Sequence, residues 1–141
     1  MSLENIMSIS GGAMDAQTAR INLAASNIAN ADTVDTSPDT AFKAKRAVFK
    51  TILEDEVHRS SFWTPGGVRV SDVIEDKSPH LAIYEPTHPL ANDKGYIYSS
   101  NVDVMTEMVD IKAASQSYES AVEASNTAKR LLNRTIEMLQ K

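Results

Sequence analysis

The chain lacks cysteine, and this absence excludes several kinds of chemistry. None of its 141 residues is cysteine, so it has no disulfide framework, thiolate zinc site or cysteine nucleophile. Long apolar runs are missing too, since no stretch approaches the roughly 18 residues that a bilayer-spanning helix needs. Basic residues are few, with 14 Lys and Arg against 19 Asp and Glu and a formal net charge of −5. This charge disfavours nucleic acid or a polybasic membrane anchor as the main mode of binding.

Motifs for catalysis and for cofactor binding are also lacking. The Gly66-Gly67 pair is not followed by Lys-Ser or Lys-Thr and is therefore a turn, and there is no Gly-x-Ser-x-Gly elbow. The spacings of His58, His80 and His88 do not match metal-ligand patterns, so structural or surface roles are expected. Glu54-Asp55-Glu56 is read as a solvated acidic cluster. We therefore predict that the protein is not an enzyme and has no catalytic, cofactor or metal site.

The start of the chain does not have the layout of a secretory signal peptide. Glu4 and Asn5 stand where a basic lead should precede an apolar segment. This predicts either a cytoplasmic protein or export by a route that leaves the N-terminus uncleaved.

Both ends of the chain carry apolar and small residues at an alternating spacing of four and three. This spacing places one seam along each of two long helices, as in a coiled coil. The first helix has few charges, and its Gly11-Gly12 pair indicates either close packing, which is slightly favoured, or a flexible point. The two seams are Leu3, Met7, Ser10, Met14, Gln17, Ile21, Ala24, Ile28 and Ala31, and Val104, Met108, Ile111, Ser115, Tyr118, Val122, Ser125, Lys129, Leu132, Ile136 and Leu139.

The middle of the chain changes to short segments with partial alternation, separated by turn residues. A polar loop is expected at 33–41, and 47–53 can be a strand or a short helix. The segments 68–74, 81–84 and 95–98 are further strand candidates. Asn101 is the expected N-cap of the last helix. We predict an α+β fold with a small, mostly antiparallel β domain between two long helices.

The predicted helices are too long for the body between them. About 38 residues of helix extend roughly 55–60 Å, whereas a body of about 60 residues has a radius of gyration near 10–11 Å. Each seam must therefore pair with the other seam, with other copies of the chain, or with other proteins.

Two asparagines stand near the end of the first predicted helix. Asn27 and Asn30 are about one turn apart, so their amides project from a similar face. Asparagine is common at helix ends and bonds readily to neighbouring groups. The residues alone do not distinguish whether Asn27 and Asn30 end the helix or form an interface.

The segment that contains these asparagines resembles a signature of the bacterial flagellar rod, hook and filament-junction proteins. That segment is Ala24-Ala25-Ser26-Asn27-Ile28-Ala29-Asn30-Ala31-Asp32-Thr33. Gly66-Gly67-Val68-Arg69-Val70, Tyr84-Glu85-Pro86-Thr87-His88-Pro89-Leu90-Ala91, Lys94-Gly95-Tyr96-Ile97 and Asn101-Val102-Asp103-Val104 look like segments of the proximal rod proteins. The resemblance covers nearly the entire chain, although 54–64, with Phe62-Trp63, is less typical.

This resemblance implies a structural subunit of the flagellar basal-body rod that transmits torque and encloses the export channel. It implies an N-terminal inner-tube helix at 1–32, a loop at 33–41, a β-rich outer domain at 42–100 and a C-terminal inner-tube helix at 101–141. The helices would pair as an antiparallel coiled coil. Implied partners are other copies, the other proximal and distal rod proteins, the adaptor between rod and export gate, and the type III export apparatus in transit. The implied location is the periplasmic rod, reached without a cleavable signal peptide.

We predict that the seams and the two asparagines form the subunit interface. The alternative is a soluble coiled-coil adaptor or export chaperone, which would share the seams but form a stable dimer at low concentration. The predicted interface residues are Met7, Met14, Ile21, Asn27, Ile28, Asn30, Met108, Ile111, Tyr118, Val122, Leu132, Ile136 and Leu139.

Overall fold

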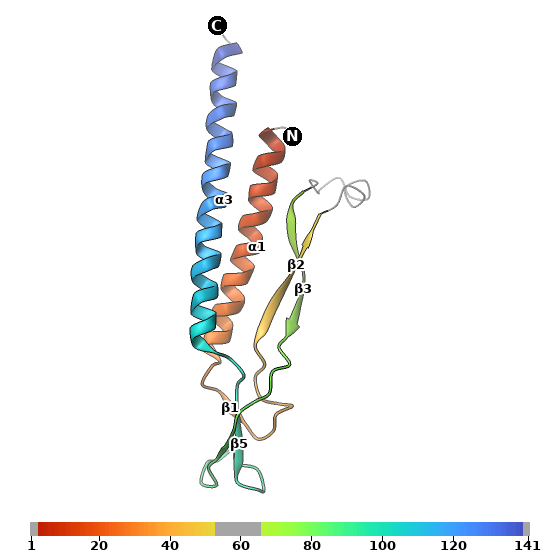
Figure 1. Ribbon diagram of the computed structural model, residues 1–141, viewed down its shortest axis with the longest axis vertical. Helices are drawn as coiled ribbons and strands as arrows, with labels where there is room; N and C mark the ends of the chain where they lie inside the picture. Colours follow the sequence, from red (N-terminus) through yellow and green to blue (C-terminus); the bar gives the residue numbers. More distant parts are fainter. Residues whose placement is uncertain (1–2, 53–65, 140–141) are drawn as a thin grey trace. The chain divides into compact units, whose positions relative to one another are not determined.

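Two long helices and two small sheets make up the computed structural model, which describes residues 3–52 and 66–139 (Figure 1). Helix α1 spans Leu3–Ala29 and helix α3 spans Val104–Leu139. The strands between them are β1 (Val34–Asp35), β2 (Lys45–Thr51), β3 (Val68–Glu75), β4 (Ala82–Tyr84) and β5 (Tyr96–Ser99). The predicted α+β class and the four strand candidates are confirmed.

The strands form two separate sheets. One sheet has the order β1-β5-β4, with antiparallel pairs such as Val34 with Ser99 and Tyr84 with Tyr96. Within residues 3–52 and 66–139, the other sheet consists of β2 and β3. Strand β1 lies inside the segment predicted to be a loop. It was missed because its two residues pair only with the distant β5, and local sequence does not show such pairing.

The backbone contacts divide the chain into two compact units. One consists of the described parts of 1–19, 48–72 and 112–141, and the other of 20–47 and 73–111. Each helix contributes residues to both units. Neither described helix combines the length and apolarity needed to cross a bilayer.

The turn between β4 and β5 requires a glycine at position 95. Gly95 has a φ of +78°, a conformation that residues with a Cβ rarely adopt. A Cβ at this position would also lie 2.9 Å from Cε2 of Tyr84. The Tyr84 ring packs edge-on against Tyr96, with ring centroids 5.2 Å apart. Gly95 therefore allows the tyrosine pair to close over the turn.

The predicted seam of α1 is its more buried face. Every seam residue from Leu3 to Ala31 is buried or half-buried, and Ser10, Ala16 and Ala24 are among the buried residues of the helix. The seam of α3 is covered only in part. Its residues Val104, Ile111, Ser115, Val122 and Ser125 are half-buried, but Met108, Tyr118 and every residue from 129 to 139 are exposed.

The adjacent glycines of α1 differ in their surroundings and provide a matched test of close packing. A Cβ on Gly12 would lie 3.1 Å from the carbonyl oxygen of Val68, whereas one on Gly11 meets nothing within 4 Å. We expect Gly11→Ala to raise the free energy of unfolding by about 0.5–1 kcal/mol through helix propensity. Gly12→Ala should lower it by about 1 kcal/mol, because the neighbouring backbone must move. Thermal unfolding of the two variants followed by circular dichroism measures both, and equal shifts would contradict the packing role of Gly12.

Candidate functional site

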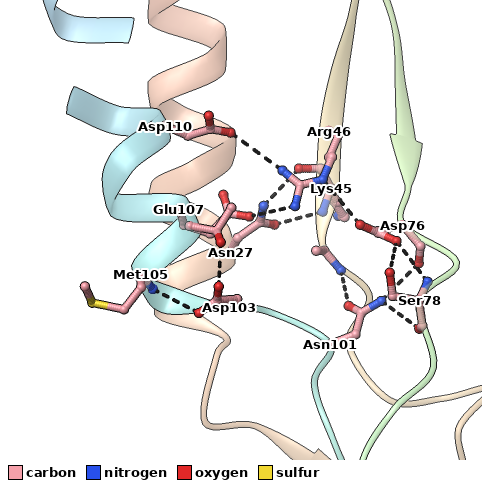
Figure 2. A network of polar contacts seen from close by, with 12 residues as sticks. Asn27, Lys45, Arg46, Asp76, Ser78, Asn101, Asp103, Met105, Glu107 and Asp110 are labelled. Atoms are coloured by element: carbon pink, nitrogen blue, oxygen red, sulfur yellow. Dashed lines mark hydrogen bonds and ion pairs between the residues drawn. The ribbon is translucent and has the colours of Figure 1, made fainter. Parts of the chain in front are cut away.

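Charged side chains from both helices, from β2 and from just beyond the end of β3 meet in one cluster, of which Figure 2 shows Arg46, Asp76, Glu107 and Asp110. We define the charged cluster as Arg20 of α1, Arg46 of β2, Asp76 just after β3, and Glu107 and Asp110 of α3. All five lie in the unit formed by 20–47 and 73–111. The cluster therefore ties the second half of α1, the start of α3 and the strand pair to one another.

Arg46 is the centre of the charged cluster. Its Nε donates to Oδ2 of Asp76 at 3.3 Å, and its Nη2 lies 3.4 Å from Oε1 of Glu107. Its Nη1 lies 3.6 Å from Oδ2 of Asp110. The planar guanidinium, with five donors, suits several carboxylates at once. One side chain of β2 thus holds three acidic groups.

Glu107 is the most buried member of the charged cluster, and Arg46 is its cation. Only 2% of Glu107 is exposed, and Oε1 has no hydrogen bond among the described residues beyond its ion pair with Arg46. A buried carboxylate without a cation is strongly unfavourable. Arg46 therefore allows α3 to bury a glutamate in its first turn, where a negative charge also suits the helix dipole.

Asp110 joins the two helices. Its Oδ1 accepts a hydrogen bond from Nη2 of Arg20 at 2.7 Å, while its Oδ2 faces Arg46. Arg20 belongs to α1 and Asp110 to α3, so this carboxylate connects α1, α3 and β2. About one-third of the Arg20 side chain is exposed, which weakens its pair with Asp110 through solvent screening.

Asn27 forms a second connection between α1 and β2. Its Nδ2 donates to the carbonyl oxygen of Lys45 at 2.9 Å, and its Oδ1 accepts from the Lys45 N–H at 2.9 Å (Figure 2). The amide thus pairs with both backbone groups of one strand residue, as a neighbouring strand would. Asn27 is fully buried, so this polar side chain keeps buried backbone groups bonded.

The side chain of Asn30 bonds within its own helix. Its Nδ2 donates to the carbonyl oxygen of Ser26 at 2.8 Å, and its backbone N–H donates to Asn27. Both bonds lie at the end of α1, so Asn30 satisfies carbonyl groups that a helix end leaves unpaired. Asn30 therefore stands at the end of the helix, and its place in a subunit interface stays a prediction.

The prediction that Asn101 caps the last helix is wrong. Asn101 lies before α3 and accepts from the N–H of Ala44 at 2.7 Å, while its Nδ2 donates to the carbonyl oxygens of Asp76 and Ser78 at 3.1 Å. The cap is Asp103, whose Oδ1 accepts from the N–H of Met105 and whose carbonyl accepts from Glu107. The Asn101 side chain is used elsewhere because its amide can satisfy one donor and two acceptors at once.

Two aspartates of this region are held ionised by hydrogen bonds. The hydroxyl and then the N–H of Ser78 lower the pKa of Asp76, with Arg46 adding to the effect. The hydroxyl of Thr106, followed by backbone N–H groups, lowers the pKa of Asp103. A carboxyl group whose pKa is lower in the folded state than in the unfolded state stabilises the fold at pH values above the unfolded-state pKa. This stabilisation is lost as the pH falls through the folded-state pKa. Both carboxylates therefore favour folding at neutral pH.

The charged cluster has the chemistry of a structural junction. Its arginines face carboxylates, and among the described residues no three Asp, Glu or His side chains come together as metal ligands would. Nδ1 of His80 bonds to the carbonyl oxygen of Ser99, and Nδ1 of His88 accepts from the N–H of Leu90. The remaining predicted features, His58, Glu54–Glu56 and the Phe62-Trp63 pair, lie outside the described residues.

The predicted interface residues divide into two groups by exposure. On α1, Met7, Met14, Ile21 and Ile28 are half-buried. On α3, Ile111 and Val122 are half-buried, while Met108, Tyr118, Leu132, Ile136 and Leu139 have exposed fractions of 52, 37, 39, 45 and 82%. The side-chain amide of Asn27 bonds to Lys45 of the same chain. Its predicted place in the subunit interface stays a prediction.

Sequence reasoning missed the charged cluster. Arg46, Asp76 and Glu107 stand in three separate segments, and nothing in their spacing indicates that they meet. One signal was present, because Glu107 and Asp110 share a helix face with the seam residues Val104 and Ile111. Acidic side chains beside a seam that is predicted to be buried require basic partners. The first helix and the strands contain few basic residues that could take this role.

Comparisons with known proteins agree with the resemblance. Residues 7–34 match the family described as "Flagella basal body rod protein", and residues 93–138 match "Flagellar basal body rod FlgEFG protein C-terminal". The flagellar basal-body rod protein FlgC of Escherichia coli O157:H7 is 45% identical over 99% of this chain and 100% of its own length. FlgC of Salmonella typhimurium is 43% identical over the same shares. FlgC of Bacillus subtilis is 33% identical over 94% of this chain and 95% of its own. The chain belongs to the FlgC family of flagellar basal-body rod proteins and is a structural subunit of that rod.

Proposed function

We propose that the chain forms part of the proximal rod, where it transmits torque and helps to enclose the export channel. The observation that carries this proposal is the end of α3. Every residue from 129 to 139 is exposed, and five of them are bulky and apolar. A lone soluble helix normally hides one apolar face. This segment is therefore suited to burial against neighbouring molecules.

The same proposal assigns roles to the predicted segments. The helices of 1–32 and 101–141 pair as an antiparallel coiled coil in the inner tube, and 42–100 forms the outer domain. Partners are other copies, other proximal and distal rod proteins and the adaptor to the export gate. The chain reaches the periplasm through the flagellar type III apparatus without a cleavable signal. Support comes from family membership and from the half-buried seam of α1.

In this rod the charged cluster would hold each subunit stiff. Torque passes through a subunit only if its parts keep their relative positions. Asn27 connects α1 to β2 through its hydrogen bond with Lys45, and Arg46 connects β2 to α3 through its ion pairs with Glu107 and Asp110. Such polar contacts specify one arrangement of the elements more strictly than apolar contacts alone.

The assembly role is tested by a charge at the exposed end of α3. We expect Ile136→Asp to prevent incorporation into the rod, because the carboxylate would have to be buried between subunits. Loss of the isoleucine contact costs each copy about 1.5–3 kcal/mol if the side chain is fully buried there. Immunoblots of purified basal bodies and swimming in soft agar measure the result, in a flagellated host that lacks its own homologue.

Thr127→Asp is the matched control for this test. It adds the same charge at an exposed polar position on the opposite face of α3, nine residues before Ile136, and we expect it to keep incorporation and swimming. Circular dichroism of both purified variants checks that the helices form equally. Normal rods with Ile136→Asp would contradict the assembly role of this face. A stable dimer of the wild-type chain at low concentration would instead favour the cytoplasmic adaptor.

A further inference from the structure

The start of α3 carries a second exposed apolar surface, separate from the end of the helix. We define the α3 patch as Met105, Met108, Val109 and Lys112, which fall on one helix face by their spacing. Met105, Met108 and Val109 are 70, 52 and 66% exposed. Lys112 is exposed as well, and no acidic residue shares the face from 105 to 116. The patch is therefore apolar with one positive charge.

The exposed face at the end of α1 has complementary properties. Asn22, Ala25 and Ala29 are exposed and follow a spacing of three and four residues along α1, and Asp32, also exposed, stands in the turn that follows the helix. The only charge in this row is negative, at Asp32. Its alanines leave space for bulky methionine and valine side chains. Seven residues separate Met105 from Lys112, about 10 Å along α3, and Asp32 follows Ala29 by three residues in the turn after α1.

We propose that the α3 patch of one copy docks on the Ala25–Asp32 row of a second copy. This inference rests on the proposed function and names the partner of one assembly face. Lys112 pairs with Asp32, and Met108 and Val109 pack around Ala29. Two different surfaces of the chain are joined, so the contact is heterologous. Such contacts do not close as dimers, and they propagate into an open helical assembly, as a rod requires, where the rotation between copies does not close a ring.

Disulfide cross-linking in assembled basal bodies tests the contact. The chain has no native cysteine, so two introduced thiols report only on each other within copies of this chain. Ala29→Cys and Val109→Cys are placed on separate genes and expressed together in the host described above. A disulfide between them can form only between two molecules, with Cβ atoms about 3.8 Å apart.

We expect a reducible dimer of this chain in basal bodies that contain both variants. Each variant expressed alone should give none. Ala29→Cys combined with Ser120→Cys, an exposed position three turns further along α3, is the matched control and should also give no dimer. Absence of the Ala29–Val109 dimer from basal bodies that contain both variants would overturn the inference but leave the rod role intact. A cross-link from Val109→Cys to a different rod protein would also overturn it, because another partner would then cover the patch.

A charge exchange provides a second readout without cysteines. Lys112→Glu alone and Asp32→Lys alone should each reduce the number of basal bodies that contain the chain, because like charges then face each other. The two variants expressed together should restore it, since alternating copies present only opposite charges. Reduction without restoration would refute the Lys112–Asp32 pairing. Failure of the wild-type chain to enter basal bodies would instead refute the proposed function itself.

Discussion

Asn27→Asp should be among the most destabilising single substitutions in this chain, although it exchanges one amide nitrogen for oxygen. We expect it to lower the free energy of unfolding by about 3 kcal/mol at neutral pH. The side chain would lose its donor to the carbonyl oxygen of Lys45, 2.9 Å away, and place a carboxylate against that oxygen. Because Asn27 is fully buried, water cannot replace the lost bond. Urea unfolding followed by circular dichroism measures the change.

The loss caused by Asn27→Asp should depend on pH, and its sign identifies the cause. Burial beside a carbonyl raises the folded-state pKa of the introduced carboxyl above its unfolded value near 3.9. The neutral acid can donate to the Lys45 carbonyl, so the variant is least destabilised below the unfolded pKa. The penalty then grows by up to about 1.4 kcal/mol per pH unit as pH rises toward the folded pKa. If the loss of unfolding free energy did not change with pH, the hydrogen bond to the Lys45 carbonyl would not be its cause.

Asn22→Asp is the control for this experiment. Asn22 lies on the same helix but is exposed, so the same chemical change should alter the free energy of unfolding by less than about 0.5 kcal/mol. Equal effects at the two positions would mean that helix charge, and not the contact with Lys45, is responsible.

The sequence predicted the elements of this fold better than their connections. The seam spacing located α1 and α3, and alternation with turn residues located β2 to β5, because these signals are local. Asn27 was singled out as a bonding residue, but its partner Lys45 could not be predicted. The pairing depends on how a helix end meets a strand, which no spacing encodes.

The errors have the same physical origin. Asn101 has the properties of a helix cap, yet Asp103 performs that role because the Asn101 amide bonds to Ala44, Asp76 and Ser78. A local rule gives way where a tertiary contact satisfies more groups. Arg46 carried no local signal at all, and its importance appears only when three acidic residues, one just after β3 and two in α3, surround it.

Arg46→Met should lower the free energy of unfolding by about 2–3 kcal/mol. The methionine keeps much of the side-chain volume but leaves Glu107 buried without a cation. The Arg46 side chain is 40% exposed, so water entering its place keeps the loss below that of a fully buried pair. Asp76 and Asp110, more than one-quarter exposed, can be hydrated and contribute less.

A double-mutant cycle separates this charge effect from simple loss of packing. In the Glu107→Leu background no buried carboxylate remains, so Arg46→Met should cost less by about 1–2 kcal/mol. The pair of Arg130 and Glu123 is the matched control, because its ion-pair distance of 3.3 Å is close to the 3.4 Å of Arg46 and Glu107. Both control side chains are more than 70% exposed, and the coupling of Arg130→Met with Glu123→Leu should stay below about 0.5 kcal/mol. Equal coupling in the two cycles, measured by urea unfolding, would show that burial of Glu107 does not make Arg46 important. Strong coupling in the Arg46 cycle alone would assign the stability of the junction to one arginine that neutralises a buried acid.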